Sequence, residues 1–153
     1  MNISTATIED ASAIFDLQRR AYQTEAAIYN DFSIPPLVET IEQLRDQFHS
    51  KCFLKATEDG RIVGSVRAFQ NAETCHVERL IVDLDYRKRG IATALLRQIE
   101  AAHPAAHRFE LYTGHKSVNN IRLYERLGYR PFRQEIVNGR LTMVFLEKSV
   151  VAA

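Results

Sequence analysis

The sequence predicts an α/β domain in which helices cover both faces of a mixed sheet. Two patterns predict this fold class. In the N-terminal half, strand-like segments are joined by short turns, which is typical of antiparallel strands. In the C-terminal half, strand-like and helical segments alternate, which is typical of parallel strands joined by right-handed crossovers. The 153 residues are 46% hydrophobic and 25% charged, a composition that supplies the core of one globular domain.

The N-terminal half is expected to begin with a strand and a helix and to continue into a group of strands. Apolar side chains three and four residues apart indicate the first helix. Thr40 is expected to cap the second helix, because Gln43 follows three residues later. Asp59-Gly60 favours a two-residue hairpin turn, since both residue types accept positive φ angles. In order, the segments are a strand at 2–6, a helix at 9–23, a break at 29–37, a helix at 41–48, and strands at 53–57, 62–69 and 75–82.

The C-terminal half is expected to alternate between helices and strands. A helix from Gly90 must end near Pro104, because proline disfavours helical angles in the residue before it. Ser117 is expected to cap a second helix that ends at Gly128, where a left-handed residue closes helices readily. The apolar face of the first of these helices consists of Ile91, Leu95, Ile99 and Ala102. Strands are expected at 109–113, 131–137 and 141–146, the last two joined by a turn at Asn138-Gly139.

The composition excludes some functional classes and bounds the domain. With 20 basic and 19 acidic side chains the formal net charge is +1, so the chain lacks the basic excess of nucleic-acid-binding domains. No signal peptide is recognisable, and no window approaches the roughly 18 apolar residues of a membrane span. We therefore expect a cytoplasmic protein that binds neither nucleic acid nor membranes, with Cys52 and Cys75 as reduced thiols. A single domain is expected at 1–148, followed by a short tail at 149–153.

The stretch 85–96, D-Y-R-K-R-G-I-A-T-A-L-L, places three basic residues beside a glycine at the start of a predicted helix. The first turn of a helix leaves about four amides without partners, and the helix dipole favours an anion beside them. Hydrogen bonds to charged groups contribute about 1.5 to 3 kcal/mol each, whereas exposed ion pairs contribute about 1 kcal/mol or less. We therefore expect the amides to bind an anion that Arg87, Lys88 and Arg89 orient. The alternative is a solvated basic loop followed by an ordinary turn glycine.

The segment 82–92, V-D-L-D-Y-R-K-R-G-I-A, resembles the acetyl-coenzyme A signature of the GNAT acetyltransferase superfamily, R/Q-x-x-G-x-G/A. Arg87, Gly90 and Ala92 occupy the defined positions of that signature. The segment 119–129, N-N-I-R-L-Y-E-R-L-G-Y, resembles the second signature of the family, a helix that ends in L-Y-E-K-L-G-F/Y. Because both motifs occur in the family's order and on the expected elements, the resemblance is specific.

The resemblance implies the three-layer GNAT fold, with a central mixed sheet of about seven strands and a gap between two parallel strands. By position these strands are 75–82 and 109–113, and acetyl-coenzyme A would enter between them. The resemblance also implies where the coenzyme binds. Its pyrophosphate would bind the amides of residues 87–93, which include Ile91 and Thr93. Its thioester arm would bind main-chain groups at Ile81 or Val82.

The implied activity is an N-acetyltransferase reaction, in which a primary amine attacks acetyl-coenzyme A directly in a ternary complex, without a metal. Tyr124 matches the family tyrosine that donates to the departing thiolate, and core packing is its alternative role. Glu78 is the candidate base that removes the amine's proton, and a surface pair with Arg79 is its alternative. His76 is a second candidate base, because an imidazole titrates at about pH 6.5; an exposed strand histidine is the alternative.

Two further groups of residues are candidates for ligand binding. Asn120 corresponds to an asparagine that in some family members binds the pantetheine arm or the diphosphate. Many relatives carry that asparagine three positions earlier, where this chain has Ser117, so either residue is a candidate. An acidic and aromatic stretch would bind a cationic amine through Glu25, Tyr29, Asp31 and Phe32. The alternative is that this stretch is a solvated loop.

The acceptor stays open among small amines, amino acids and peptide N-termini. One rival function is a coenzyme A-binding domain that regulates without catalysis, and another is a nucleic-acid-binding module that uses the basic turn. The histidines and cysteines lie on different predicted elements, so no metal site is expected. Many family members dimerise, so a homodimer is compatible with the resemblance.

Overall fold

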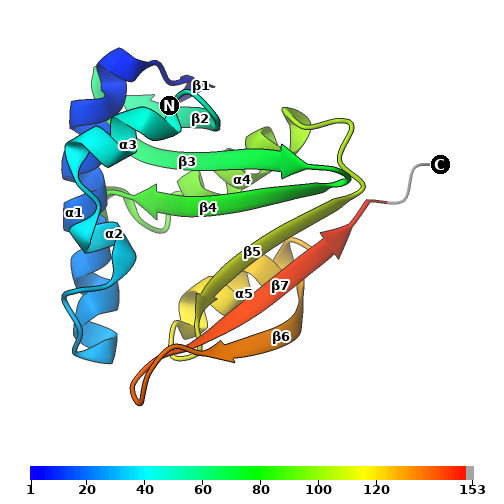
Figure 1. Ribbon diagram of the computed structural model, residues 1–153. Helices are drawn as coiled ribbons and strands as arrows, with labels where there is room; N and C mark the ends of the chain where they lie inside the picture. The colour runs from blue at the N-terminus through cyan, green and yellow to red at the C-terminus, as the bar shows by residue number, and fades with distance from the viewer. Residues whose placement is uncertain (151–153) are drawn as a thin grey trace.

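Seven strands form one sheet at the centre of the computed structural model, which describes residues 1–150 (Figure 1). The strand order is β1-β2-β3-β4-β5-β7-β6, and each neighbouring pair is antiparallel except the parallel pair β4 and β5. The predicted mixed sheet is therefore confirmed. The strands are β1 Asn2–Thr5, β2 Cys52–Glu58, β3 Arg61–Asn71, β4 Thr74–Val82, β5 Arg108–Gly114, β6 Arg130–Ile136 and β7 Thr142–Ser149.

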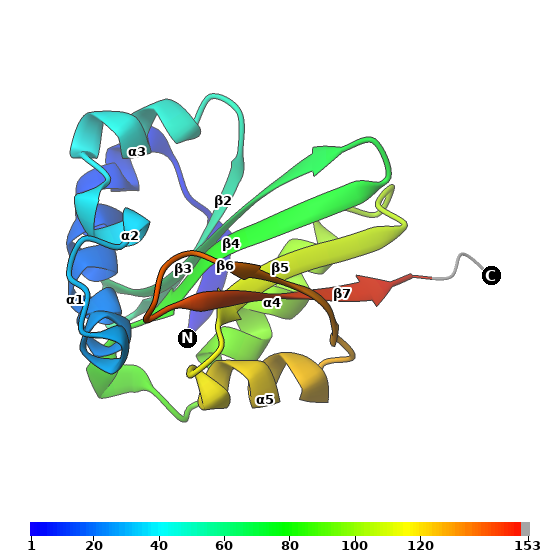
Figure 2. The same cartoon turned by 60° about the horizontal axis from the view of Figure 1, so that its bottom comes forward.

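Helices cover both faces of the sheet, as Figures 1 and 2 show together. α1, α2 and α3 lie on one face, and α4 and α5 lie on the other. The helices are α1 Ala11–Tyr29, α2 Pro35–Val38, α3 Ile41–Gln47, α4 Ile91–Ala101 and α5 Val118–Arg126, with short 3-10 helices at Ile8–Asp10 and Leu84–Tyr86. The three-layer arrangement predicted from the sequence is thereby confirmed.

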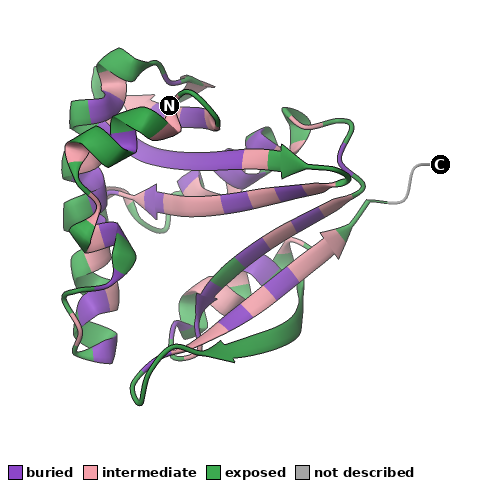
Figure 3. Cartoon of the chain, in the orientation of Figure 1, coloured by how far each residue is buried: buried purple, intermediate pink, exposed green. Residues whose placement is uncertain are grey.

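Burial follows from these layers (Figure 3). β3 is buried from Val63 to Ala68 without alternation, because helices cover both of its faces. The larger apolar cluster joins the sheet to α4 and α5, and a smaller cluster joins it to α1 and α3. β6, at the sheet edge, is exposed along its whole length. The central strands, including β4 with its candidate site residues, are therefore held between two helical layers.

Two local signals in the N-terminal half are confirmed. Thr40 Oγ1 accepts a hydrogen bond from the Gln43 amide at 3.1 Å, and Gln43 Oε1 accepts one from the Thr40 amide at 2.9 Å. These two bonds form the predicted capping box at the start of α3. Asp59 and Gly60 have φ angles of 53° and 74°, as the predicted hairpin turn between β2 and β3 requires.

The first helix is longer than predicted, and the predicted break contains a helix. α1 continues beyond residue 23 to Tyr29, and Asn30 ends it in a left-handed conformation with a φ of 48°. Pro35 and Pro36 begin α2 inside the segment that was expected to be irregular. Proline is tolerated in the first turn because an amide there has no intrahelical acceptor. The prolines therefore start a helix here.

Two details of the C-terminal half differ from prediction. Ala102, expected on the apolar face of α4, is exposed because it follows the last helical residue, and Leu96 is buried instead. The turn at Asn138-Gly139 is present, but neither residue has a positive φ. The Asn138 side chain shapes it, because its Oδ1 accepts hydrogen bonds from the amides of Arg140 and Leu141 at 2.8 and 3.0 Å.

The C-terminal strand reaches into the predicted tail. Ser149, expected to open the tail, is the last residue of β7, and the Val150 amide donates to the His107 carbonyl at 2.8 Å. The rest of the predicted tail, 151–153, lies outside the described residues. Cys52 and Cys75 are free thiols, as expected.

Candidate active site

The two parallel strands diverge along their length. β4 and β5 pair only through Thr74–His76 and Arg108–Glu110, at the end where both strands begin. Beyond these residues β5 pairs only with β7, and Figure 1 shows β4 and β5 separating toward α1. The main-chain groups on the β5 side of β4 therefore have no strand partner beyond His76. This confirms the gap expected between residues 75–82 and 109–113.

A β-bulge accompanies the separation. Glu78 lies opposite Arg67 and Ile81 lies opposite Ser65, so two residues of β4 face one residue of β3. One of the two, Arg79, has a φ of 53°, which is uncommon for a residue with a long side chain. The bulge bends β4 away from β5 and changes the direction in which the side chains after Glu78 project. The segment contains no glycine or asparagine from which the bulge could have been predicted.

A cleft of about 1020 Å³ occupies the gap and continues toward α1; it is called the cleft below. Its walls come from α1, β4, the turn at 83–90, α4, β5 and α5. Of the residues predicted to bind the coenzyme, Arg89 does not line it, and its guanidinium lies 5.0 Å from the centre of the Tyr86 ring. The predicted catalytic and coenzyme-binding residues that line the cleft are Glu78, Ile81, Val82, Arg87, Lys88, Gly90, Ile91, Ala92, Thr93, Ser117, Asn120 and Tyr124.

The start of α4 faces open space at one end of the cleft. Gly90 precedes the helix with a φ of 79°, and Lys88 also has a left-handed φ of 64°. A Cβ added at Gly90 would meet no atom within 4 Å, so the backbone there is accessible. Helix geometry leaves the amides of Ile91, Ala92 and Thr93 without intrahelical acceptors. These open amides and the helix dipole are the features on which the predicted anion site depends.

The turn before α4 is anchored on both sides. Asp83 is buried, and its carboxylate accepts hydrogen bonds from the Asp85 amide at 3.0 Å and from Arg20 of α1 at 3.3 Å. The Arg87 guanidinium donates to the Ala21 carbonyl of α1 at 3.4 Å. The basic turn is therefore tied to α1 and is not a freely solvated loop.

Tyr124 projects from α5 into the cleft. Its side chain is 7% exposed, and its hydroxyl has no hydrogen-bond partner among residues 1–150. Burial raises the pKa of Tyr124 well above its usual value, and the charges of Tyr22 and Glu25 raise it further. The hydroxyl is therefore a neutral donor that is available to a ligand.

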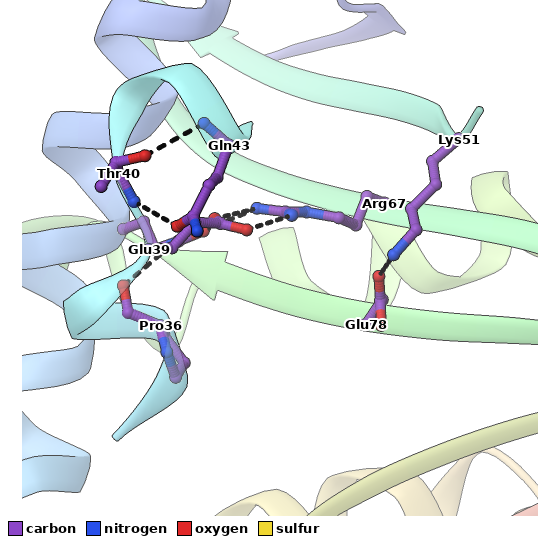
Figure 4. A network of polar contacts seen from close by, with 8 residues as sticks. Pro36, Glu39, Thr40, Gln43, Lys51, Arg67 and Glu78 are labelled. Atoms are coloured by element: carbon purple, nitrogen blue, oxygen red, sulfur yellow. Dashed lines mark hydrogen bonds and ion pairs between the residues drawn. The ribbon is translucent and has the colours of Figure 1, made fainter. Parts of the chain in front are cut away.

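The two candidate bases on β4 lie in different surroundings. Glu78 lines the cleft and forms an ion pair with Lys51, as Figure 4 shows. Its expected alternative partner, Arg79, forms no ion pair with it. His76 lies outside the cleft, where its ring stacks on Phe69 at 4.9 Å and its Nδ1 lies 3.6 Å from Glu110. The structure thus places Glu78, and not His76, at the site.

Ser117 connects α1 to the start of α5, although it was expected to cap that helix. Its hydroxyl makes no capping bond; it donates to Glu25 Oε2 at 2.5 Å and lies 2.7 Å from the Tyr29 hydroxyl. Asn120 Nδ2 donates to Glu25 Oε1 and to Thr113 Oγ1, both at 3.3 Å. Ser117 therefore lies at the predicted N-cap position of α5, but its hydroxyl binds the carboxylate of Glu25 instead of a helix amide, because tertiary structure brings the two residues together.

The acidic and aromatic stretch is only partly in the cleft. Glu25 and Tyr29 line it, whereas Asp31 accepts a hydrogen bond from the Ser33 amide at 2.9 Å and Phe32 is 55% exposed. Sequence reasoning assigned Arg79 only as a partner of Glu78 and gave Tyr22 no role, yet both line the cleft. The sequence pattern of the first helix did not indicate that Tyr22 lines the cleft.

A close approach joins α1 to β5 at the same end of the cleft. A Cβ added at Gly114 would lie 1.9 Å from the Tyr29 hydroxyl. That hydroxyl also accepts a hydrogen bond from the Lys116 amide at 3.0 Å, so it cannot move freely. Glycine is therefore required at position 114.

The remaining expectations concern metals and membranes. Within residues 1–150, no group of three or more histidine, cysteine, aspartate or glutamate side chains is arranged to hold a metal ion. Over the same residues, every helix is too short or too polar to cross a membrane.

Comparison with known proteins agrees with this geometry. The model of the acetyltransferase (GNAT) family matches residues 11–129. The uncharacterized N-acetyltransferase MJ1207 of Methanocaldococcus jannaschii is 31% identical over 115 residues, which are 64% of this chain and 50% of that protein. The N-acetylaspartate synthetase of Xenopus tropicalis is 32% identical over 123 residues, which are 76% of this chain and 45% of that protein. The chain thus spans about half the length of these relatives.

Solved structures share the fold over the whole chain. The crystal structure of the PaiA N-acetyltransferase from Thermoplasma acidophilum, in complex with coenzyme A, has a TM-score of 0.80 to this structure at 19% sequence identity. The alignment covers 98% of this chain and 100% of that one. The likeness extends the agreement in fold beyond the residues that the family model matches.

Proposed function

The chain belongs to the acetyltransferase (GNAT) family, and on this premise we propose that it transfers the acetyl group of acetyl-coenzyme A to a primary amine. One observation carries the proposal: a single cleft reaches from the open amides of α4 to the hydroxyl of Tyr124. Neither Cys52 nor Cys75 lines that cleft, and burial raises the pKa of Cys75 to about 12. Direct attack by the amine in a ternary complex is therefore favoured over an acetylated thiol on the protein.

The gap between β4 and β5 fits acetyl-coenzyme A. The amides of Ile91, Ala92 and Thr93 would bind its diphosphate, with Arg87 and Lys88 adding positive charge. The unpaired main-chain edge of β4 at Ile81 and Val82 offers donors and acceptors to the amide groups of the pantetheine arm. The thioester of the cosubstrate supplies the acetyl group. The role of Asn120 is to hold the arm beside α5, through an amide that now bonds Glu25 and Thr113.

Tyr124 is the proposed donor to the departing sulfur. A thiol has a pKa of about 8.5, so at neutral pH the thiolate needs less stabilisation than an alkoxide but still gains from an aligned hydrogen bond. Because burial keeps the Tyr124 hydroxyl neutral, it donates rather than accepts. Core packing alone does not account for a hydroxyl that faces the cleft.

Glu78 is the proposed base. A primary amine is mostly protonated at neutral pH and must lose a proton before it attacks. The Glu78 carboxylate lines the cleft, and its ion pair with Lys51 fixes its position there. The proton passes from the acceptor's ammonium group to this carboxylate, directly or through water.

The same ion pair favours one second candidate function. The Glu78 carboxylate is already engaged by Lys51, and a domain that only binds coenzyme A needs no base at all. In that case the chain would be a regulatory domain that responds to coenzyme A without acetyl transfer.

Release of free thiol from acetyl-coenzyme A, measured with a panel of primary amines, separates the two functions. Amine-dependent release with an acetylated product detected by mass spectrometry is the expected result. Coenzyme A binding measured by calorimetry, together with no transfer to any amine of the panel, would leave only the regulatory function. In the enzyme, the Glu78→Gln variant should be slower at neutral pH, and the difference from the parent should shrink as pH rises toward the pKa of the amine, because an unprotonated acceptor needs no base.

A further inference from the structure

Arg79 is a cation in the cleft that forms no ion pair with an acidic side chain of residues 1–150. Its Nε is buried and has no hydrogen-bond acceptor in the part of the chain that the structure describes. The carboxylates nearby already have partners: Glu39 accepts from both Nη atoms of Arg67 at 3.0 and 3.1 Å, and Glu78 is paired with Lys51 (Figure 4). Removing part of a guanidinium from water without supplying an acceptor costs free energy. A ligand that carries an anion would supply one.

Glu25 is the complementary case on the α1 side of the cleft. Its two carboxylate oxygens accept hydrogen bonds from Ser117 and Asn120, which are neutral donors. It forms no ion pair with a basic side chain of residues 1–150, unlike Glu78, the other acidic residue that lines the cleft. These bonds fix the position of the carboxylate and leave its charge available to a cationic ligand.

Tyr22 lines the same cleft as these two charged side chains. Burial raises the pKa of Tyr22 to about 12, while the guanidinium of Arg79 lowers it and the carboxylate of Glu25 raises it, so both charges act on the same hydroxyl. The carboxylate of Glu25 also raises the pKa of Tyr124. Glu25 thus acts on both tyrosine hydroxyls, whereas Arg79 acts on that of Tyr22.

We propose, building on the acetyl transfer proposed above, that the acceptor is a free amino acid whose carboxylate binds Arg79 and whose ammonium group binds Glu25. The planar guanidinium matches a carboxylate and orients it through paired hydrogen bonds. Glu25 then holds the amine on the side of Tyr124, where the acetyl group is transferred. A simple alkyl amine would leave Arg79 unpaired, and so would a peptide whose first residue carries no free carboxylate.

The test compares each standard L-amino acid with its own carboxamide as acceptor, in the presence of acetyl-coenzyme A. The two molecules share the amine and the side chain and differ in the carboxylate alone. For the best acceptor, kcat/KM should exceed that of the carboxamide by roughly 10- to 100-fold, the range of a charge-assisted hydrogen bond. In Arg79→Gln this preference should disappear, while the affinity for coenzyme A stays unchanged. Arg97→Gln, which removes an exposed arginine of α4 outside the cleft, should keep the preference.

A conservative variant guards against an effect of folding. Arg79→Lys keeps the positive charge but loses the paired donors of the guanidinium. It should therefore retain part of the preference for amino acids over carboxamides, while melting at the same temperature as Arg79→Gln. Equal use of amino acids and carboxamides by the parent, or an unchanged preference in Arg79→Gln, would overturn the role of Arg79 and leave acetyl transfer standing. Absence of transfer to every acceptor of both series, with coenzyme A still bound, would overturn the proposed function and this inference together.

Discussion

The two ends of the cleft are built from different parts of the chain. The end at α4 consists of main-chain amides that follow Gly90, and it needs little from side chains beyond a left-handed glycine. The end at α1 consists of side chains, Glu25 and Tyr22 from the helix and Arg79 from the β4 bulge. A main-chain site tolerates changes of neighbouring residues, whereas a side-chain site changes its ligand with each substitution. The comparison explains how one fold can keep a cosubstrate and vary the acceptor.

Tyr124 stands between the two ends, and its removal should have the largest effect. Tyr124→Phe keeps the ring and removes the hydroxyl, so turnover should fall about 100-fold, as for loss of a positioned proton donor. The affinity for coenzyme A, measured by calorimetry, should stay within about twofold, because the diphosphate site is at α4. Turnover equal to that of the parent would reduce Tyr124 to a core residue.

At the α1 end of the cleft, the contact of Gly114 with Tyr29 holds α1 against β5. Gly114→Ala should lower the free energy of unfolding by about 2 kcal/mol, because the added methyl group overlaps an anchored tyrosine. Urea denaturation measures the change. Gly139→Ala is the matched control, since a Cβ there meets nothing within 4 Å, and its stability should not change. Equal stabilities of the two variants would show that α1 and β5 are not held against each other.

The third prediction compares main chain with side chain at α4 itself. Gly90→Ala forces alanine into a φ of 79° and should weaken coenzyme A binding about 10-fold. Arg89→Gln removes an exposed charge that lies outside the cleft and should weaken binding about twofold or less. If the arginine variant lost more affinity than the glycine variant, the anion site would depend on side chains and the contrast between the two ends would fail.

The smallest effect concerns the hydroxyl of Tyr22 at the α1 end. Tyr22 has a pKa of about 12 in the folded protein, against an ordinary value of 10.0. The stability that this raised pKa contributes is fully present below about pH 10 and is lost as pH rises toward 12. Between about pH 9 and about pH 11, the parent should therefore lose about 1 kcal/mol more stability than Tyr22→Phe. Parallel pH profiles of the two proteins would mean that the Tyr22 hydroxyl is solvated.

The sequence predicted well what depends on neighbouring residues. Thr40 with Gln43 indicated a cap, Asp59-Gly60 a hairpin, and Gly90 the start of a helix, because in each case the signal and the structure lie within a few residues. The order of the elements then placed β4 beside β5, and the gap followed from the family resemblance.

The side-chain end of the cleft depends on partners that are distant in sequence. Glu25 meets Ser117 across 92 positions, and Lys51 meets Glu78 across 27 positions. Ser117 carried the residue type of a helix cap, and only the tertiary structure showed that it bonds Glu25 instead. Arg79 takes a left-handed conformation without glycine or asparagine, because the bulge in β4 requires it. Single-sequence patterns contain no signal for such contacts.

The central claim is that the main-chain amides at the start of α4 bind the diphosphate of coenzyme A in a cleft that leads to Tyr124. Amide chemical shifts measured by NMR while coenzyme A is added test it directly. We predict the largest shifts at Gly90, Ile91, Ala92 and Thr93, with smaller ones along β4 at Ile81 and Val82. The claim would be contradicted by saturable binding in which the chemical shifts of those amides stay unchanged and those of residues outside the cleft change.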